Sequence, residues 1–158
     1  MTGPDFPDAY FFRAFCFQAL GRLSEAEASL RVALELMPGD TVYSCELGHL
    51  LHQRRDWEGA LVRFDDAIQG LHELRSIHGA PTGASLMGMS LRDWHRRALR
   101  GRGFSLIELG RLDEAEAAYR QALALDANDT RAQTELNLIA HLRRQGLEPP
   151  GAFDDRAR

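Results

Sequence analysis

The feature that most limits the fold of this chain is a stretch that occurs nearly unchanged twice. The two copies are LGRLSEAEASLRVALELMPGD from Leu20 and LGRLDEAEAAYRQALALDAND from Leu109, with 13 of 21 aligned positions identical. A weaker copy between them is RRDWEGALVRFDDAIQGLHE, from Arg54. The step to it is 34 residues, and the next step is 55, which is 34 plus an insertion of 21. A period in the thirties is typical of stacked helical repeats, so the sequence predicts an all-α solenoid.

Each unit has the pattern of two antiparallel helices. A small residue allows close approach of the helices, a large one fills the space one turn later, and a second small one follows at helical spacing. A glycine, Gly21 or Gly110, supplies the turn between helices. The three sets are Ala26, Ala60 and Ala115; Leu30, Phe64 and Tyr119; and Ala33, Ala67 and Ala122. Capping boxes are predicted at the second helices, formed by Ser24 with Glu27 and by Asp113 with Glu116.

This pattern resembles the tetratricopeptide repeat, or TPR, over about three quarters of the chain. With units at 7–40, 41–74 and 96–129, the small position eight of each unit is Ala14, Gly48 or Gly103. The proline that ends a repeat in this family is present only as Pro38. The resemblance implies one domain, residues 1–146: a right-handed superhelix of three repeats, closed by a capping helix at 130–145. A flexible tail is expected at 147–158.

The insertion, residues 75–95, predicts two overlong helices. The apolar pattern runs on past the place of the missing proline, so one helix is expected from about Asp56 to about His78. A loop then follows, and Ser90 with Asp93 resembles the capping box of the next helix. The projection carries Met87, Met89 and Trp94, which either pack the long helices together or form a partner or dimer surface.

The resemblance also implies a concave groove lined by the first helix of each unit. Such a groove would suit a peptide with apolar anchors and a carboxylate. Alternatively, the aromatic residues are ordinary core and the arginines are merely solvated. The chaperone-tail clamp of some family members is not expected, because Arg97 alone keeps the required charge. The predicted groove residues are Phe11, Phe15, Cys45, His49, His52, Arg97, Arg100 and Phe104, to which the last helix adds Arg131, Thr134 and His141.

Two other chemistries are less well supported by the sequence. Cys45, His49 and His52 lie on one helical stripe, where three metal ligands or a redox-active thiol are alternatives to plain groove lining. No metal or cofactor is predicted, because no further ligand is evident. The run RDWHRRALRGRG, from Arg92 to Gly103, mixes arginines with Trp94, as in some nucleic-acid-binding segments. Asp93 interrupts it, and pairing with acidic neighbouring helices is the preferred interpretation.

Composition excludes several classes of function. The 158 residues carry a net charge of −4, so general nucleic-acid binding is not expected. All 19 basic residues are arginine, which excludes Schiff-base catalysis by lysine. The two cysteines fall inside apolar helical patterns and indicate a reduced, cytoplasmic protein. We find neither a signal peptide nor a segment of membrane-spanning length in the sequence.

The sequence therefore predicts a non-enzymatic scaffold or adaptor that binds a protein or peptide. It contains no phosphate-binding loop, nucleophile elbow or catalytic triad. Two alternatives remain open: a structural module that forms homodimers through the long helices, and a chaperone like those of bacterial type III secretion. The identity of the partner is not encoded in any motif we recognise.

Overall fold

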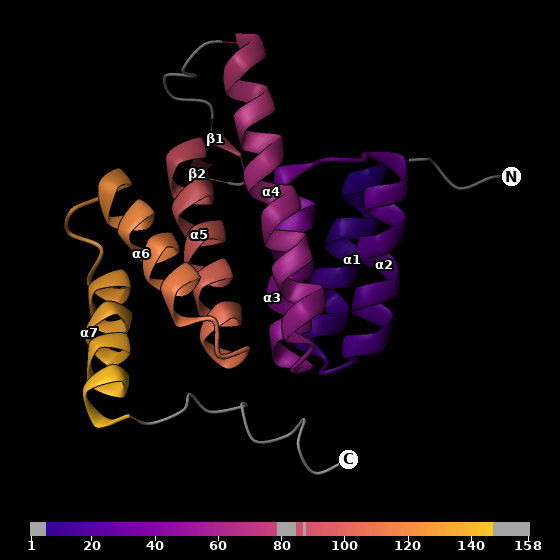
Figure 1. Ribbon diagram of the computed structural model, residues 1–158. Helices are drawn as coiled ribbons and strands as arrows, with labels where there is room; N and C mark the ends of the chain where they lie inside the picture. Colours follow the sequence, from indigo (N-terminus) through magenta and orange to yellow (C-terminus); the bar gives the residue numbers. More distant parts are fainter. Residues whose placement is uncertain (1–5, 79–84, 87, 147–158) are drawn as a thin grey trace, which may run out of the picture.

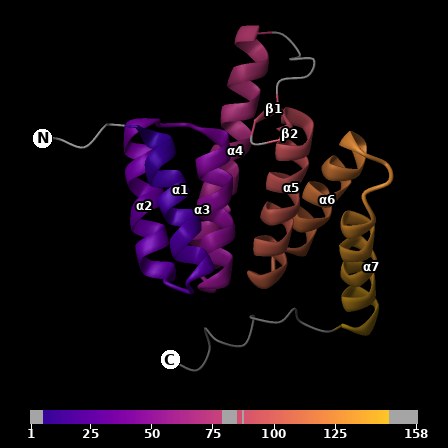
Figure 2. The ribbon, with the colours of Figure 1, turned by 180° about the vertical axis from the view of Figure 1, so that it is seen from behind.

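The computed structural model describes residues 6–78, 85–86 and 88–146, and 83% of the structure is helical. Consecutive helices pack as the pairs α1–α2, α3–α4 and α5–α6, which stack side by side, and α7 packs on α6 (Figures 1 and 2). The fold is the predicted all-α solenoid. Its helices are α1 (Pro7–Ala19), α2 (Leu23–Leu36), α3 (Thr41–Gln53), α4 (Trp57–His78), α5 (Leu91–Glu108), α6 (Leu112–Leu125) and α7 (Thr130–Gln145).

The core lies where the repeated small and large residues predict it. All nine residues of the three predicted sets are at most 1% exposed. The rings and leucine of the middle set fill the space between helices, and the alanines let α2, α4 and α6 approach their neighbours closely. Burial of this kind contributes about 25 cal/mol per Å² of apolar surface, so the repeat pattern itself supplies the main stabilising term.

The turns between paired helices are as predicted, but two of the predicted capping boxes are wrong. Gly21 and Gly110 have φ values of 72° and 78°, which a glycine adopts without strain. The N-caps of α2 and α6 are arginines, Arg22 and Arg111, and neither makes a side-chain capping bond. Each arginine instead pairs with a glutamate three residues on, so an ion pair stands where a hydroxyl or carboxylate cap was expected.

α4 and α5 are the longest of the described helices, while the assignment of their length to an insertion at 75–95 stays a prediction. α4 has 22 residues, about 33 Å at 1.5 Å per residue, and it extends beyond its neighbours (Figure 1). The expected loop contains a short antiparallel pair, β1 (Ser85–Leu86) and β2 (Met89–Ser90), which the sequence did not predict. Ser90 then caps α5 in the predicted box with Asp93. The remaining insertion residues, 79–84 and 87, and the predicted tail at 147–158 lie outside the described residues.

The last helix closes the solenoid at the predicted position. α7 ends at Gly146, which has a φ of 59°. Arg143 is exposed, and its guanidinium group also pairs with Asp113 and Glu116 on α6. None of the helices that the structure describes is long and apolar enough to cross a membrane.

Candidate functional site

A pocket of about 210 Å³ opens between α3, α5 and α7, with one residue contributed by α6. Five of the eight predicted groove residues line it, and Arg131 from the last helix joins them. The repeat pattern therefore brings together side chains that are more than eighty residues apart in sequence. The lining consists of His49 and His52 from α3; Arg97, Arg100, Gly101 and Phe104 from α5; Tyr119 from α6; and Arg131 and Glu135 from α7.

Two glycines, one on α3 and one on α5, make room for the ring of Phe64. The ring of Phe64 on α4 lies between α3 and α5, where a Cβ on Gly48 would be 2.9 Å from it and a Cβ on Gly101 only 2.3 Å. Contacts below 3.0 Å are not tolerated without movement, so both positions require glycine if Phe64 is to keep its place. The ring of Phe64 in turn supports both pocket histidines, with centroids 4.9 Å from His49 and 5.0 Å from His52.

One side of the pocket is aromatic. The ring centroid of Phe104 lies 5.2 Å from that of His52 and 5.8 Å from that of Trp57, at the start of α4. Phe104 keeps 37% of its surface exposed, so it can still bury apolar area against a ligand. The hydroxyl of Ser105 donates to the Gly101 carbonyl oxygen, at 3.1 Å, which leaves it to accept from His52 Nε2 at 2.7 Å. That bond fixes the orientation of the imidazole ring.

Both pocket histidines are neutral at pH 7. Burial lowers the pKa of His52 to about 4. Burial also lowers the pKa of His49 to about 3, and the positive charge of Arg97 nearby contributes. His49 Nε2 is buried and has no hydrogen-bond partner in the described part of the chain. The charge of the pocket therefore comes from its arginines and from Glu135.

The three arginines of the pocket differ in how they are held. Arg97 donates from its Nη2 to Glu46 Oε1 at 2.9 Å, and Arg100 from its Nη1 to Asp129 Oδ2 at 2.9 Å. Neither acidic partner lines the pocket, so these guanidinium groups are positioned from behind and keep further N–H groups for a ligand. Arg131 makes no ion pair or hydrogen bond with any described residue.

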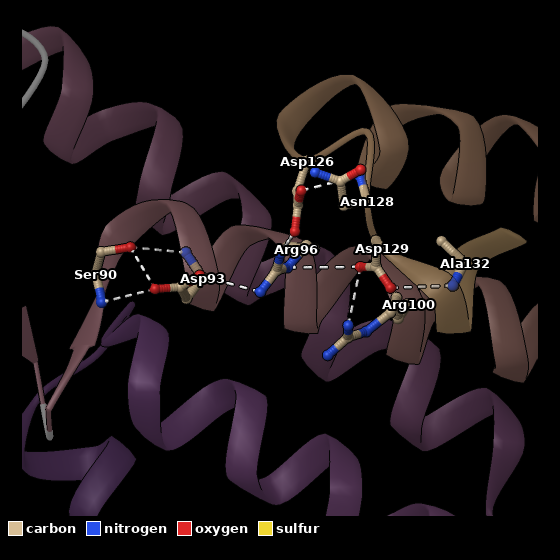
Figure 3. Close-up of polar contacts among 8 residues, drawn as sticks. All are labelled: Ser90, Asp93, Arg96, Arg100, Asp126, Asn128, Asp129 and Ala132. Carbon is tan, nitrogen blue, oxygen red and sulfur yellow. Dashed lines mark hydrogen bonds and ion pairs between the residues drawn. The ribbon is translucent and has the colours of Figure 1, made fainter.

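Asp129 connects the pocket to the C-terminal end of the solenoid (Figure 3). Its carboxylate caps α7 by accepting from the Ala132 backbone N–H at 3.1 Å, and it also binds Arg100. Arg96 lies 3.5 Å away through its Nε and pairs in addition with Asp93 and Asp126. α5 is thereby tied to the start of α7, which carries Arg131 and Glu135. The full network drawn in Figure 3 is Ser90, Asp93, Arg96, Arg100, Asp126, Asn128, Asp129 and Ala132.

Three of the eight predicted groove residues do not line the pocket. Phe11 is buried in the core, where its ring centroid lies 5.3 Å from that of Tyr43. Cys45 lies on the buried side of α3 and is fully buried, and this burial raises the pKa of its thiol to about 12. Phe15 is exposed, but it lies on α1, apart from the pocket. Consecutive residues of a helix point 100° apart, so core and groove positions alternate closely along each helix. The repeat register alone therefore did not distinguish the two.

The predicted partner surface on the insertion is also corrected in part. Trp94 is only 3% exposed and belongs to the core, and Met89 is half-buried against it. Met87 lies outside the described residues. Met89 and Trp94 therefore pack among the helices, which is the first of the two alternatives given above, and do not form an exposed partner surface.

The stripe of one cysteine and two histidines is not arranged as a metal site. Within the ranges described, no group of three or more histidine, cysteine, aspartate or glutamate side chains is placed to hold a metal ion. The thiol of Cys45 is buried and protonated at neutral pH, and His52 Nε2 is already hydrogen-bonded to Ser105. A thiolate metal ligand or redox centre requires the opposite environment.

Arginines of the run from Arg92 to Gly103 pair with acidic neighbours, which is the interpretation preferred from the sequence. Arg96 pairs with three aspartates, and Arg102 donates to Asp65 on α4 at 2.7 Å. Trp94, the aromatic residue of the run, is buried and cannot stack on a base.

Solved structures that resemble this fold include several TPR domains. The first TPR of Spaghetti (RPAP3), solved with the HSP90 peptide SRMEEVD, is 16% identical with a TM-score of 0.68; the match covers 87% of this chain and 93% of that one. The N-terminal domain of stress-induced protein-1 from C. elegans is 10% identical with a TM-score of 0.69, covering 85% and 94%. The TPR2AB domain of yeast Sti1, in a complex with pHSP90, is 16% identical with a TM-score of 0.70, covering 89% and 48%. At these identities the likeness shows the fold alone.

Two segments of the sequence match family models for the tetratricopeptide repeat, residues 7–40 and residues 96–129. The chain is a TPR protein. The matched ranges are those assigned above to the first and third TPR units, while the middle unit at 41–74 stays a prediction from spacing. No curated protein matches the sequence significantly.

Three residues of this TPR site were not predicted from the sequence. Glu135 lies four residues after Arg131 on α7, a spacing that places both on one face of the helix. Tyr119 was predicted as core, and its edge also reaches the pocket. Gly101 departs from the larger residues at the same position of the other units, Phe12 and Glu46, and that departure was the available signal.

Proposed function

We propose that this TPR protein is a non-enzymatic adaptor that binds a polypeptide segment in the pocket between α3, α5 and α7. The ligand presents a carboxylate to the arginines and sets an aromatic or aliphatic side chain against the aromatic wall. The observation that carries the proposal is the pocket lining, in which three arginines face a wall built around Phe104.

The size of the pocket favours a side chain of a larger ligand. Sites for small molecules usually measure about 300–1,000 Å³, whereas this one measures about 210 Å³. A single side chain or chain end fits such a volume. Two of its arginines are held by ion pairs from behind, so less conformational entropy is lost when they bind a carboxylate.

The neighbouring folds give the proposal a comparison and a negative control. The RPAP3 domain was solved with the acidic HSP90 peptide SRMEEVD. Only Arg97 keeps the charge that the chaperone-tail clamp requires, so SRMEEVD itself is expected to bind poorly. The five clamp positions hold Phe11, Phe15, Glu46, Arg97 and Gly101. The acidic group would instead meet Arg100 and Arg131, nearer the C-terminal end.

The test is a selection of binders from a random twelve-residue peptide library displayed on phage, followed by affinities of the selected synthetic peptides. We expect enrichment of Asp or Glu beside an aromatic or aliphatic residue. Arg131→Gln and Phe104→Ala should each weaken binding about tenfold, from loss of a charge-assisted hydrogen bond or of apolar contact.

The matched control is Arg144→Gln, on the same helix as Arg131 and outside the pocket lining. It should leave affinity within about twofold. Selected peptides that bind the Arg131 and Phe104 variants as tightly as the unaltered protein would refute the proposal, and so would a selection that yields no binder.

A further inference from the structure

The outer side of α1 is apolar and exposed. At 100° per residue, the exposed residues of α1 and its C-cap fall within an arc of about 160°, opposite the buried Phe11 and Ala14. We name this surface the α1 outer face. It consists of Asp8, Ala9, Phe12, Arg13, Phe15, Cys16, Ala19 and Leu20, all exposed.

Such a helix has the composition of a buried one. Amphipathic surface helices carry polar residues on the side away from the core, whereas helices that are apolar all round are covered on all sides. Six of the eight residues on the α1 outer face are apolar or cysteine. Its two charged residues contact neighbouring helices, since Arg13 donates to Ser29 on α2 and Asp8 accepts from Tyr43 on α3. No contact of the six apolar or cysteine side chains with α3 to α7 places a described helix over them, because α1 packs mainly on α2.

The two ends of the solenoid differ in this respect. The corresponding outer side of α7, at the other end, carries the exposed polar residues Gln133, Asn137 and Arg144. That end is suited to water, as a capping helix should be. On the α1 outer face, by contrast, Asp8 and Arg13 are the only polar residues apart from Cys16.

The repeat geometry shows that a helix fits on the α1 outer face. Within its unit, α7 uses Ala132, Ile139 and Leu142 to pack on α6, and all three are buried. The same unit positions in α1 are Ala9, Cys16 and Ala19. These smaller residues leave room for large side chains from a helix that approaches them.

We propose that a second copy of this chain covers the α1 outer face, with the two α1 helices packed antiparallel about a two-fold axis. The face is self-complementary in that arrangement. When the two-fold axis crosses the helices at the level of residue 14, Phe12 of one copy opposes Cys16 of the other, and Ala9 opposes Ala19.

Charge and area agree with this occupant. The only charged residues of the face are Asp8 and Arg13, so two copies of an acidic protein meet there without like-charge repulsion. Phe12, Phe15 and Leu20, the large apolar residues of the face, are 55%, 57% and 68% exposed. At about 200 Å² for a phenylalanine and slightly less for a leucine, they expose about 340 Å². A standard interface of about 800 Å² per partner is about 57% apolar, or about 450 Å², so these three side chains supply about three quarters of that area.

This surface is separate from the pocket, so the dimer and the proposed peptide binding can fail independently. The test is sedimentation velocity of the whole chain between 1 and 100 µM. We expect a dimer that dissociates on dilution. Phe12→Glu and Cys16→Arg should each raise the dissociation constant at least a hundredfold, because every substitution occurs twice in a two-fold interface. The matched control is Leu138→Glu on α7, 41% exposed, which should stay dimeric.

Cross-linking provides a second measurement. Cys16 is exposed and Cys45 is buried, so a short bis-maleimide should join two copies through Cys16 alone. The covalent dimer should disappear in Cys16→Ser. Circular dichroism checks that each variant keeps its helices.

A chain that stays monomeric at 100 µM would overturn the proposal; in that case the face is covered by a different polypeptide or by residues outside the described ranges. A dimer that withstands both Phe12→Glu and Cys16→Arg would overturn it as well, because the copies would then meet elsewhere.

Discussion

Replacing Asp129 with alanine removes a carboxylate that serves three groups at the start of α7. The side chain is only 2% exposed. It accepts the Ala132 backbone N–H, binds Arg100 Nη1 and lies 3.5 Å from Arg96 Nε. The substitution therefore removes a helix cap and leaves Arg100 without an ion-pair partner among the described residues.

The expected cost follows from these contacts. Loss of an N-cap costs about 1 kcal/mol. Loss of a hydrogen bond between charged groups costs about 2 kcal/mol. Arg96 keeps Asp93 and Asp126, so it adds little. Asp129→Ala should lower the free energy of unfolding by about 3 kcal/mol.

Asp129→Asn separates the two contributions. Asparagine caps helices about as well as aspartate does, so only the charge interaction is lost, and the cost should be about 2 kcal/mol. The matched control is Asp113→Ala, whose side chain pairs with Arg143 but is 97% exposed. An exposed ion pair of this kind contributes at most about 1 kcal/mol.

The assay is equilibrium unfolding in urea, followed by circular dichroism, with amide hydrogen exchange to locate the effect. α7 should lose protection before the other helices, because a solenoid is stabilised by contacts between neighbouring units. An Asp129→Ala variant that loses no more stability than Asp113→Ala would refute the role assigned to this carboxylate. Equal losses in the alanine and asparagine variants would refute the capping share of it.

Three further measurements check other parts of the structure. Gly101→Ala should lower the free energy of unfolding by about 1–3 kcal/mol in urea, because its Cβ would lie 2.3 Å from Phe64; an unchanged stability would contradict that contact. The two pocket histidines have pKa values of about 3 and 4 in the folded state against 6.5 in a free side chain, so the unfolded chain binds more protons below pH 6.5. Their contribution should therefore fall by about 2 kcal/mol in total from pH 7 to pH 5, allowing for partial exposure, and replacing both with glutamine should flatten the curve. At nanomolar concentration a maleimide should label Cys16 and leave Cys45 unlabelled until urea is added, since only Cys16 is exposed; rapid labelling of both would contradict the burial of the second thiol.

The helices and their core were predictable because they depend on spacing that occurs three times. A small residue such as Ala26, followed by Leu30 one turn later and Ala33 after that, defines one side of a helix without any tertiary information. The long α4 was predictable for the same reason, since no proline interrupts its apolar pattern. The short β1–β2 pair was not, because two-residue strands have no periodicity to detect.

The ends of α2 and α6 were harder to predict, since two physical solutions compete there. Ser24 and Asp113 are good capping residues, yet each lies inside its helix by two positions. The arginine before each helix pairs with a glutamate in the first turn instead. Sequence alone does not say which of the two arrangements is lower in free energy, because both satisfy local charge and hydrogen-bonding rules.

Only part of the site could be read from register. His49, His52 and Arg100 line the pocket, because their positions in the repeat unit, 9, 12 and 5, lie on one side of the first helix. Phe11 and Cys45 were assigned to the groove by the same register and are buried. The depth of a side chain depends on how far each helix rotates against its neighbours, and a rotation of a few tens of degrees moves a residue from surface to core.

The positions that differ between units explain why one solenoid presents two different surfaces. Position six of the three units holds Phe12, Glu46 and Gly101. Phe12 is exposed and apolar on α1, Glu46 on α3 holds Arg97 from behind, and Gly101 on α5 makes room for the ring of Phe64. Repeated positions cannot distinguish one end of a solenoid from the other, since they build the same core in every unit. Whatever this protein recognises must therefore depend on the positions that do not repeat, and substitutions there should change binding while leaving the helices intact.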